Sequence, residues 1–303
     1  MALEADRYFD RRRLKRRLTL WRIIAIAAIV AIVAVAFGRW GSFGSSASIA
    51  TLDVSNVIFD DPDRNKALKR LAKNDRIKAL IVRINSPGGT VVGGESLYLN
   101  LRDIAEKKPV VAVLGELATS AGYMAALGAD HIIGRKSTIT GSIGVLMQTT
   151  EITGLLDKLG IKAETIKSAP LKAQPNPLEP MSPEARAAAN EVIADIYGMF
   201  VDMVVARRNM SREKVLKIAD GRVYTGRQAI KNGLIDALGG IDTARQWLAS
   251  SRNIDKNLPL QPVKIKRKRD SLLGLLDDLF GKTLFSERLR LDGVISLWHP
   301  ELR

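Results

Sequence analysis

The most extended apolar run of the chain lies near its N-terminus. Residues 23–37 read IIAIAAIVAIVAVAF without a charged side chain, and residues 18–21 lengthen the run. A transmembrane helix needs about 20 such residues. Trp21 and Trp40 stand at the two ends, where interfacial anchors are typical. The pattern predicts one membrane-spanning signal anchor over residues 21–40.

Basic residues precede this segment. The run RRRLKRR at residues 11–17 lies wholly on its N-terminal side, so the positive-inside rule predicts a cytoplasmic basic tail over residues 1–20 and places the remaining chain outside. A cleaved signal peptide is the alternative, because Ala-Val-Ala at 34–36 has the small-x-small form of a cleavage site. The long basic region and the long apolar core favour an anchor, followed by a flexible linker at 41–48.

After the linker, apolar runs alternate with segments of helical spacing. Continuous apolar strands separated by helices are typical of a parallel sheet that is covered on both faces. The strands are expected at 49–59, 77–84, 109–115, 130–134, 144–149 and 161–167, and the helices at 61–73, 92–107, from about 120, at 151–160 and at 182–208. The sequence therefore predicts an α/β domain over residues 49–252, with a basic and amphipathic tail over 253–303.

Composition narrows the chemistry. The formal net charge is +15, but much of the excess lies in residues 11–17 and in KIKRKR at 264–269, and neither run contains an aromatic residue that could stack on a base. We therefore expect no nucleic-acid partner. The chain has no cysteine and only two histidines, His131 and His299, which excludes thiolate chemistry and leaves little room for a histidine-based site.

Two segments carry residues suited to acyl transfer. The sequence SPGG at 86–89 directly follows a buried run, so its amides are exposed at the end of a strand, where they could stabilise an oxyanion; a plain tight turn is the alternative. Ser120 lies between a strand and a helix of small residues, ATSAGYMAALGA at 118–129. That setting presents a hydroxyl at a helix N-terminus, although a helix-capping serine has the same pattern.

A serine nucleophile needs a base. With histidine nearly absent, a lysine kept neutral by burial is the other option. Lys172 lies in KSAPLKAQPNPLEP at 167–180, a segment stiffened by three prolines. From these residues alone, a solvated surface lysine is the more common interpretation.

Taken in order, five segments resemble the signal peptide peptidase A family in its short bacterial form. They are INSPGGTVVGGESLY at 84–98, VVAVLGELATSAGYMAALGAD at 110–130, TGSIGVLMQ at 140–148, IKSAPLK at 166–172 and YTGRQAIKNGLIDALGG at 224–240. The glycine and serine segments are also similar to the Clp protease and crotonase superfamily. This resemblance implies a Clp/crotonase-like spiral of ββα units.

The resemblance also implies roles for individual residues. Ser120 would be the nucleophile and Lys172 its general base, and Ser142 would hydrogen-bond the lysine amine and orient it. The backbone N–H groups of Gly89 and Ala121 would hold the oxyanion. Ala121 departs from the glycine often found at this position, which affects local packing more than a backbone donor. No metal or cofactor is implied.

The function implied is that of a serine endopeptidase anchored in the bacterial inner membrane, with its catalytic domain on the periplasmic or extracytoplasmic side. Its substrates would be signal-peptide remnants and other extended apolar peptides, and its assembly a homo-oligomeric ring. The main alternative is a catalytically inactive membrane scaffold of the same fold. A crotonase-like acyl-CoA enzyme fits less well, because the acidic catalytic residues of that family are not evident.

Overall fold

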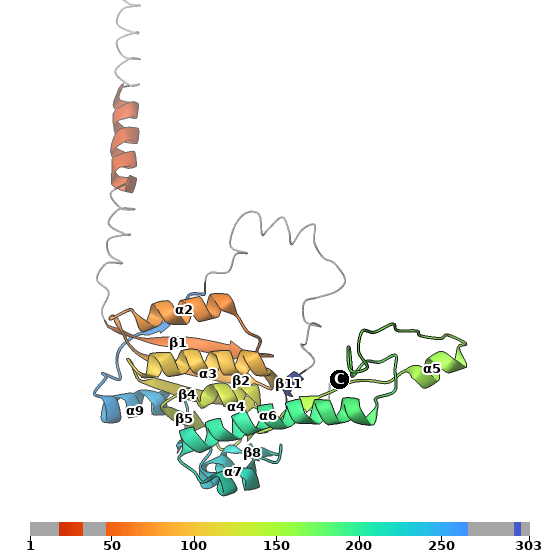
Figure 1. The fold of residues 1–303 in the computed structure, drawn as a ribbon. Helices are drawn as coiled ribbons and strands as arrows, with labels where there is room; N and C mark the ends of the chain where they lie inside the picture. Colours follow the sequence, from red (N-terminus) through yellow and green to blue (C-terminus); the bar gives the residue numbers. More distant parts are fainter. Residues whose placement is uncertain (1–17, 33–46, 266–293, 298–303) are drawn as a thin grey trace, which may run out of the picture. The chain divides into compact units, whose positions relative to one another are not determined.

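The computed structural model describes residues 18–32, 47–265 and 294–297 (Figure 1). The chain divides into two units, Met1–Ser46 and Ala47–Arg303. In the first unit residues 18–32 form a helix. Within the described ranges no helix is both long and apolar enough to cross a membrane. The rest of the predicted span, most of the basic tail and linker, the amphipathic segment 272–280 and His299 lie outside the described residues.

The second unit is built on one sheet whose central strands are parallel. Along its main path the order is β10-β1-β2-β4-β5-β9, and β6 and β8 extend it beside the end of β4. The strands are β1 Ser48–Ser55, β2 Ile77–Ser86, β4 Val110–Thr119, β5 His131–Gly134, β6 Ile139–Gly141, β8 Val223–Thr225, β9 Ala237–Leu238 and β10 Leu260–Pro262. Parallel neighbours require crossover connections, and helices supply most of them.

Helices cover both faces of this sheet (Figure 1). On β2, Leu80, Val82 and Ile84 pack with α2, α3 and α4, whereas Ala79 and Ile81 pack with α9 on the other face. Successive side chains of a strand point to opposite faces, so both sets can be apolar. The helices are α2 Pro62–Ala72, α3 Val91–Ala105, α4 Ala121–Ala126, α5 Thr153–Lys158, α6 Pro183–Arg208, α7 Arg212–Ile218, α8 Gly226–Asn232 and α9 Ile241–Arg252. The predicted α/β class is confirmed.

A second, three-stranded sheet lies beside the first. Its order is β3-β11-β7, with β3 Gly88–Thr90, β11 Val294–Leu297 and β7 Leu146–Met147, and β11 runs antiparallel to both neighbours. The sheet thus joins the SPGG turn to a segment from the far end of the chain.

One predicted strand is wrong. Residues 161–167 have no regular structure, and Ile166 is 95% exposed. They belong to an arm, residues 148–182, that carries α5 and extends away from the sheet (Figure 1). A strand needs a partner for its backbone groups, and the described residues provide none at this place.

Candidate active site

The SPGG turn is held by the backbone of Ile58. The N–H of Ile58 donates to the carbonyl of Gly88 at 2.8 Å, and the N–H of Thr90 donates to the carbonyl of Ile58 at 2.9 Å. Since a trans peptide directs its N–H opposite to its carbonyl, the N–H of Gly89 points away from Ile58. A Cβ at Gly89 would lie 1.9 Å from the Ile58 oxygen. Glycine is therefore required for this close approach.

Ser120 occupies a strained position between β4 and α4. Its φ is 57° and its ψ −122°, and its residue exposure is 1%. A positive φ is uncommon outside glycine and costs on the order of 1–3 kcal/mol. The hydroxyl does not cap α4, so the helix-capping alternative does not explain this serine. A serine on a strained strand-to-helix turn is also the arrangement found in a nucleophile elbow.

Ser142 lies next to Ser120 because two strand ends are paired. In the parallel β4–β6 pair, Thr119 is opposite Gly141, and each is followed by one of the two serines. The N–H of Ser120 donates to the carbonyl of Gly141 at 2.9 Å. Ser142 is buried and also has a positive φ, 50°. The structure therefore brings together two of the predicted site residues that are far apart in sequence.

The start of α4 packs against the SPGG turn and α3. Ala121 is fully buried. A Cβ added at Gly94 of α3 would lie 2.9 Å from the Cβ of Ala121, and one added at Gly122 would lie 3.2 Å from the carbonyl oxygen of Ser86. Small residues thus allow the strands and helices around Ser120 to approach closely.

Lys172 lies apart from this group. It is exposed on the arm between α5 and α6, where its backbone N–H donates to the carbonyl of Ala169 at 3.1 Å. Ser120 and Ser142, by contrast, are both buried. The burial expected of a lysine base is therefore absent in the single chain.

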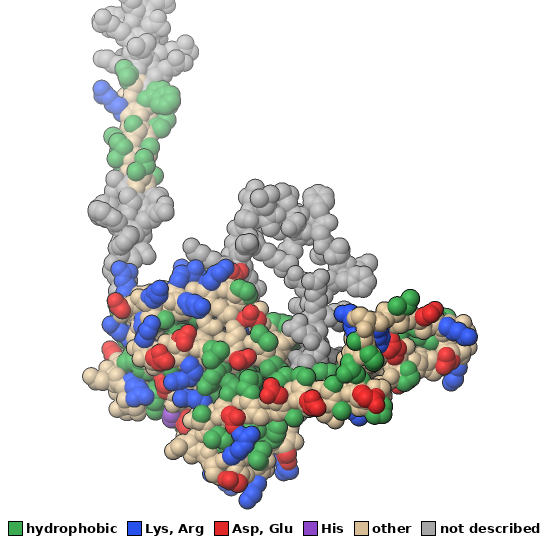
Figure 2. Space-filling model, viewed as in Figure 1, with side chains coloured by type: hydrophobic (Ala, Val, Ile, Leu, Met, Phe, Trp, Pro, Cys, Tyr) green, Lys and Arg blue, Asp and Glu red, His purple; other side chains and the backbone are tan. Residues whose placement is uncertain are grey.

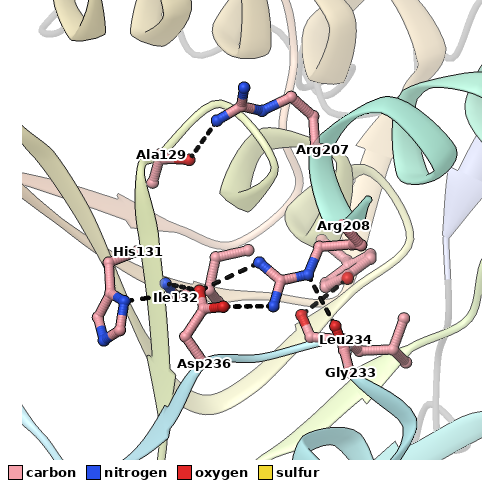
Figure 3. Close-up of polar contacts among 9 residues, drawn as sticks. Ala129, His131, Ile132, Arg207, Arg208, Gly233, Leu234 and Asp236 are labelled. Carbon is pink, nitrogen blue, oxygen red and sulfur yellow. Dashed lines mark hydrogen bonds and ion pairs between the residues drawn. The ribbon is translucent and has the colours of Figure 1, made fainter. Parts of the chain in front are cut away.

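His131 has a structural setting. Its ring stacks on Trp247 with centroids 4.6 Å apart. Its Nδ1 lies 3.8 Å from the carboxylate of Asp236 (Figure 3). The same carboxylate accepts hydrogen bonds from the N–H of Ile132 at 2.7 Å and from Arg208. Burial lowers the pKa of His131, although Asp236 opposes this. These contacts join β5, α6 and α9 rather than form part of the Ser120 site.

A buried, strained serine at the end of a parallel strand, beside a turn with an outward amide, is an arrangement suited to serine-type acyl transfer on an α/β fold. The model of peptidase family S49 matches residues 102–255, about half of the chain. A protein of Synechocystis provisionally named a protease, slr0021, is 43% identical over 190 residues, which are 63% of this chain and 68% of that protein. The chain belongs to peptidase family S49, a family of serine-type peptidases.

Two further comparisons are weaker in extent or likeness. The chloroplastic serine protease SPPA of Arabidopsis thaliana is 32% identical over 225 residues, 73% of this chain but 33% of that protein. A solved structure of a membrane-bound stomatin-specific protease aligns with a TM-score of 0.48 at 15% identity, over 73% of this chain and 99% of that chain. A TM-score below 0.5 does not establish a shared fold, so the Clp-like spiral stays a prediction.

Proposed function

We propose that the protein is a serine endopeptidase anchored in the bacterial inner membrane, with Ser120 and Lys172 as a catalytic dyad. The observation that carries this proposal is the conformation of Ser120. The residue is held at a positive φ, its hydroxyl is not used to cap α4, and Ser142 follows the strand end paired with its own. Backbone strain of this kind persists where the surrounding structure enforces it, often at active sites.

The proposed reaction runs through an acyl-enzyme. The neutral amine of Lys172 takes the hydroxyl proton as Ser120 attacks the peptide carbonyl, and the amides of Gly89 and Ala121 stabilise the oxyanion. The ammonium then returns its proton to the leaving amine, and the C–N bond breaks. In the second half, the amine takes a proton from water, which attacks the ester carbonyl. The ammonium then returns this proton to Ser120 Oγ as the C–O bond of the ester breaks, and the acid leaves. Ser142 orients the amine throughout.

The exposure of Lys172 argues for assembly. Lys172 is exposed in the single chain, whereas a lysine that serves as a general base is desolvated by its surroundings. The proposed dyad therefore requires a surface that covers Lys172. The arm that carries Lys172 also exposes apolar side chains that a partner could cover (Figure 2). They are Leu155, Leu159, Ile161, Ile166, Leu171 and Leu178. We propose that a second copy of the chain covers this arm in a homo-oligomeric ring.

The proposed substrates are signal-peptide remnants and other extended apolar peptides. Support comes from the resemblance to signal peptide peptidase A and from the protease names of the relatives. The apolar run at 23–37 and the basic run before it support an N-terminal anchor, with the catalytic domain on the periplasmic or extracytoplasmic side.

Active-site labelling tests the proposal. A fluorophosphonate probe should label the purified full chain at Ser120, and the Ser120→Ala variant should stay unlabelled at the same protein concentration. The Ser120→Ala variant should also lose cleavage of a fluorogenic apolar peptide. A folded, oligomeric wild-type protein that takes no label and cleaves no peptide would favour the inactive scaffold instead.

A further inference from the structure

One side-chain hydrogen bond joins the strand that precedes Ser120 to the SPGG turn. The backbone pairing of β2 with β4 extends to Ser86, which lies opposite Ala118. The next residue of β4, Thr119, is fully buried and donates from Oγ1 to the carbonyl of Pro87 at 3.0 Å. Ser120 follows Thr119 directly, so this link to the turn begins one residue from the candidate nucleophile.

The peptide between Pro87 and Gly88 is held at its other polar group by Ser86. The N–H of Gly88 donates to Ser86 Oγ at 3.1 Å, and Ser86 is fully buried. Ser86 Oγ in turn donates to the carbonyl of Asn56, just after β1, at 2.5 Å. This peptide is therefore bonded at its carbonyl by Thr119 of β4 and at its N–H by the last residue of β2.

The next peptide carries the N–H of Gly89, which is assigned to the oxyanion in the proposed mechanism. The carbonyl of that peptide, on Gly88, accepts from the N–H of Ile58 at 2.8 Å. The two peptides meet at the Cα of Gly88, whose φ is 122°. A residue without a Cβ permits many angles between its two peptides, so steric contacts alone do not fix the direction of the Gly89 N–H. Hydrogen bonds on both sides of Gly88 fix it, and Thr119 supplies one of them.

From this geometry we infer that Thr119 is a positioning residue, which sets the direction of the Gly89 amide relative to the hydroxyl of Ser120. Because Thr119 and Ser120 are neighbours at one strand end, the same element places the nucleophile and, through Pro87, the oxyanion donor. The inference rests on the proposed function and deepens it by naming the contact that aligns the two halves of the site.

The inference predicts a particular kinetic pattern. The Gly89 amide acts on the negative charge that develops on the carbonyl oxygen during attack, so its alignment affects the transition state more than the bound peptide. A misaligned amide should therefore lower kcat and leave KM nearly unchanged. A role of Thr119 in stability alone should instead lower the melting temperature and leave the kcat of each folded site as it is.

Two substitutions at Thr119 test this pattern in the purified full chain. Thr119→Val keeps the shape of the side chain and removes the donor. It should lower kcat, expressed per fluorophosphonate-labelled site, by about 10- to 100-fold with KM within about twofold, a part of the loss expected when an oxyanion donor is removed. Thr119→Ser keeps the hydroxyl and should restore kcat. A Thr119→Val variant with the kcat of wild type would overturn the positioning role.

Thr140→Val is the matched control. Thr140 lies on the neighbouring strand β6, is equally buried, and donates from Oγ1 to the carbonyl of Ala118 at 2.6 Å. The control therefore also loses a buried threonine hydrogen bond to the backbone, but one that does not reach the SPGG turn. It should lose melting temperature about as Thr119→Val does and keep its kcat. Similar kcat losses in both variants would contradict the inference, because they would assign the effect to a general loosening of β4.

The NMR signal of the Gly89 amide provides a readout that needs no turnover. When the carbonyl carbon and the amide nitrogen of glycine are isotopically labelled, signals can be selected from glycines that follow another glycine. In this chain these are Gly89, Gly94 and Gly240. The Gly89 signal should shift in Thr119→Val and stay in place in Thr140→Val. Gly240, which directly precedes α9, should stay in place in both variants.

The two readouts separate failure of the inference from failure of the proposed function. If wild type takes no label and cleaves no peptide, the proposed function fails, and the Gly89 signal alone decides whether Thr119 fixes the turn. An unchanged Gly89 signal in Thr119→Val would overturn the inference. A Gly240 signal that shifts together with Gly89 would also contradict it, because the change would then extend through the fold.

Discussion

The N–H of Ser120 donates a hydrogen bond to the carbonyl of Gly141 at 2.9 Å. This bond continues the parallel pairing of β4 and β6 by one residue, past the point where Thr119 lies opposite Gly141. Beyond it, Ser120 and Ser142 both turn into a positive φ. The position of the candidate nucleophile therefore depends on a three-residue strand that begins 19 residues further along the chain.

Ser120→Ala and Lys172→Ala should each abolish peptide turnover and leave folding and assembly intact. In the proposed mechanism the two residues act as one catalytic unit, so the double variant should be little worse than either single variant. Turnover of a fluorogenic peptide and melting temperature measure the two effects. Substantial turnover by purified Ser120→Ala would end the nucleophile assignment.

Ser142→Ala should reduce kcat by about 10- to 1000-fold, less than the loss of either dyad residue. The substitution would remove the orienting hydrogen bond proposed for Ser142, while the proposed nucleophile and base both remain. Steady-state kinetics across pH would show it. A variant that matches wild type at every pH would remove Ser142 from the mechanism.

Activity should rise with pH through one ionisation toward an alkaline plateau, because a lysine base works only as the free amine. Lys172→Met keeps a chain of similar length without the amine and should be inactive at every pH. The measurement is kcat/KM against pH. A profile centred near pH 4 to 5 would point to a carboxylate base and away from the dyad.

Gly141→Ala should destabilise the protein by about 1–3 kcal/mol and reduce turnover. The residue has a φ of 86°, and an added Cβ would lie 2.8 Å from Cδ2 of Tyr224. Gly160→Ala is the control, with a φ of 70° and no neighbouring atom within 4 Å, so it should lose only roughly 1 kcal/mol through backbone strain. Denaturant unfolding would compare them. Equal losses in the two variants would show that the Tyr224 contact is unimportant.

His131 should make stability fall as pH drops below about 6.5. Burial lowers its pKa in the folded state, Asp236 opposes this, and Arg208 adds to the lowering. Between the folded and unfolded pKa values the unfolded chain binds more protons, so stability rises with pH there and is unaffected above 6.5. His131→Phe preserves an aromatic ring to stack on Trp247 and should show a smaller loss of melting temperature between pH 7.5 and 5. An unchanged loss would assign the effect to other groups.

Local sequence determined the order of the main elements. The buried runs at 77–84 and 109–115 became β2 and β4, and the segment from Ser182 became α6, because apolar periodicity and capping are properties of neighbouring residues. In α6 the cap is visible, with the N–H of Ala185 donating to Ser182 Oγ at 3.1 Å. The SPGG turn and the position of Ser120 between a strand and a helix could be predicted for the same reason, because both depend on neighbouring residues.

The pairing of strands that are distant in sequence could not be predicted from the sequence. β6 and β8 have three residues each, too few for a periodic signal, and residues 161–167 carried a strand pattern without meeting a partner strand. The pairing of β11 with β3 links residues about 200 positions apart. Each of these outcomes depends on which backbone groups meet in space, and composition along the chain does not encode that.

In the candidate site, too, residue types follow from the sequence and their placement follows from the tertiary structure. The sequence supplied a serine, a lysine and a glycine turn of suitable chemistry, since residue type fixes what a side chain can donate or accept. The tertiary structure decided that Ser120 and Ser142 lie at paired strand ends and that Ile58 aims the amide of Gly89. It also left Lys172 exposed in the single chain. Whether a lysine can serve as a base depends on the surface that covers it, and such a surface is a property of packing.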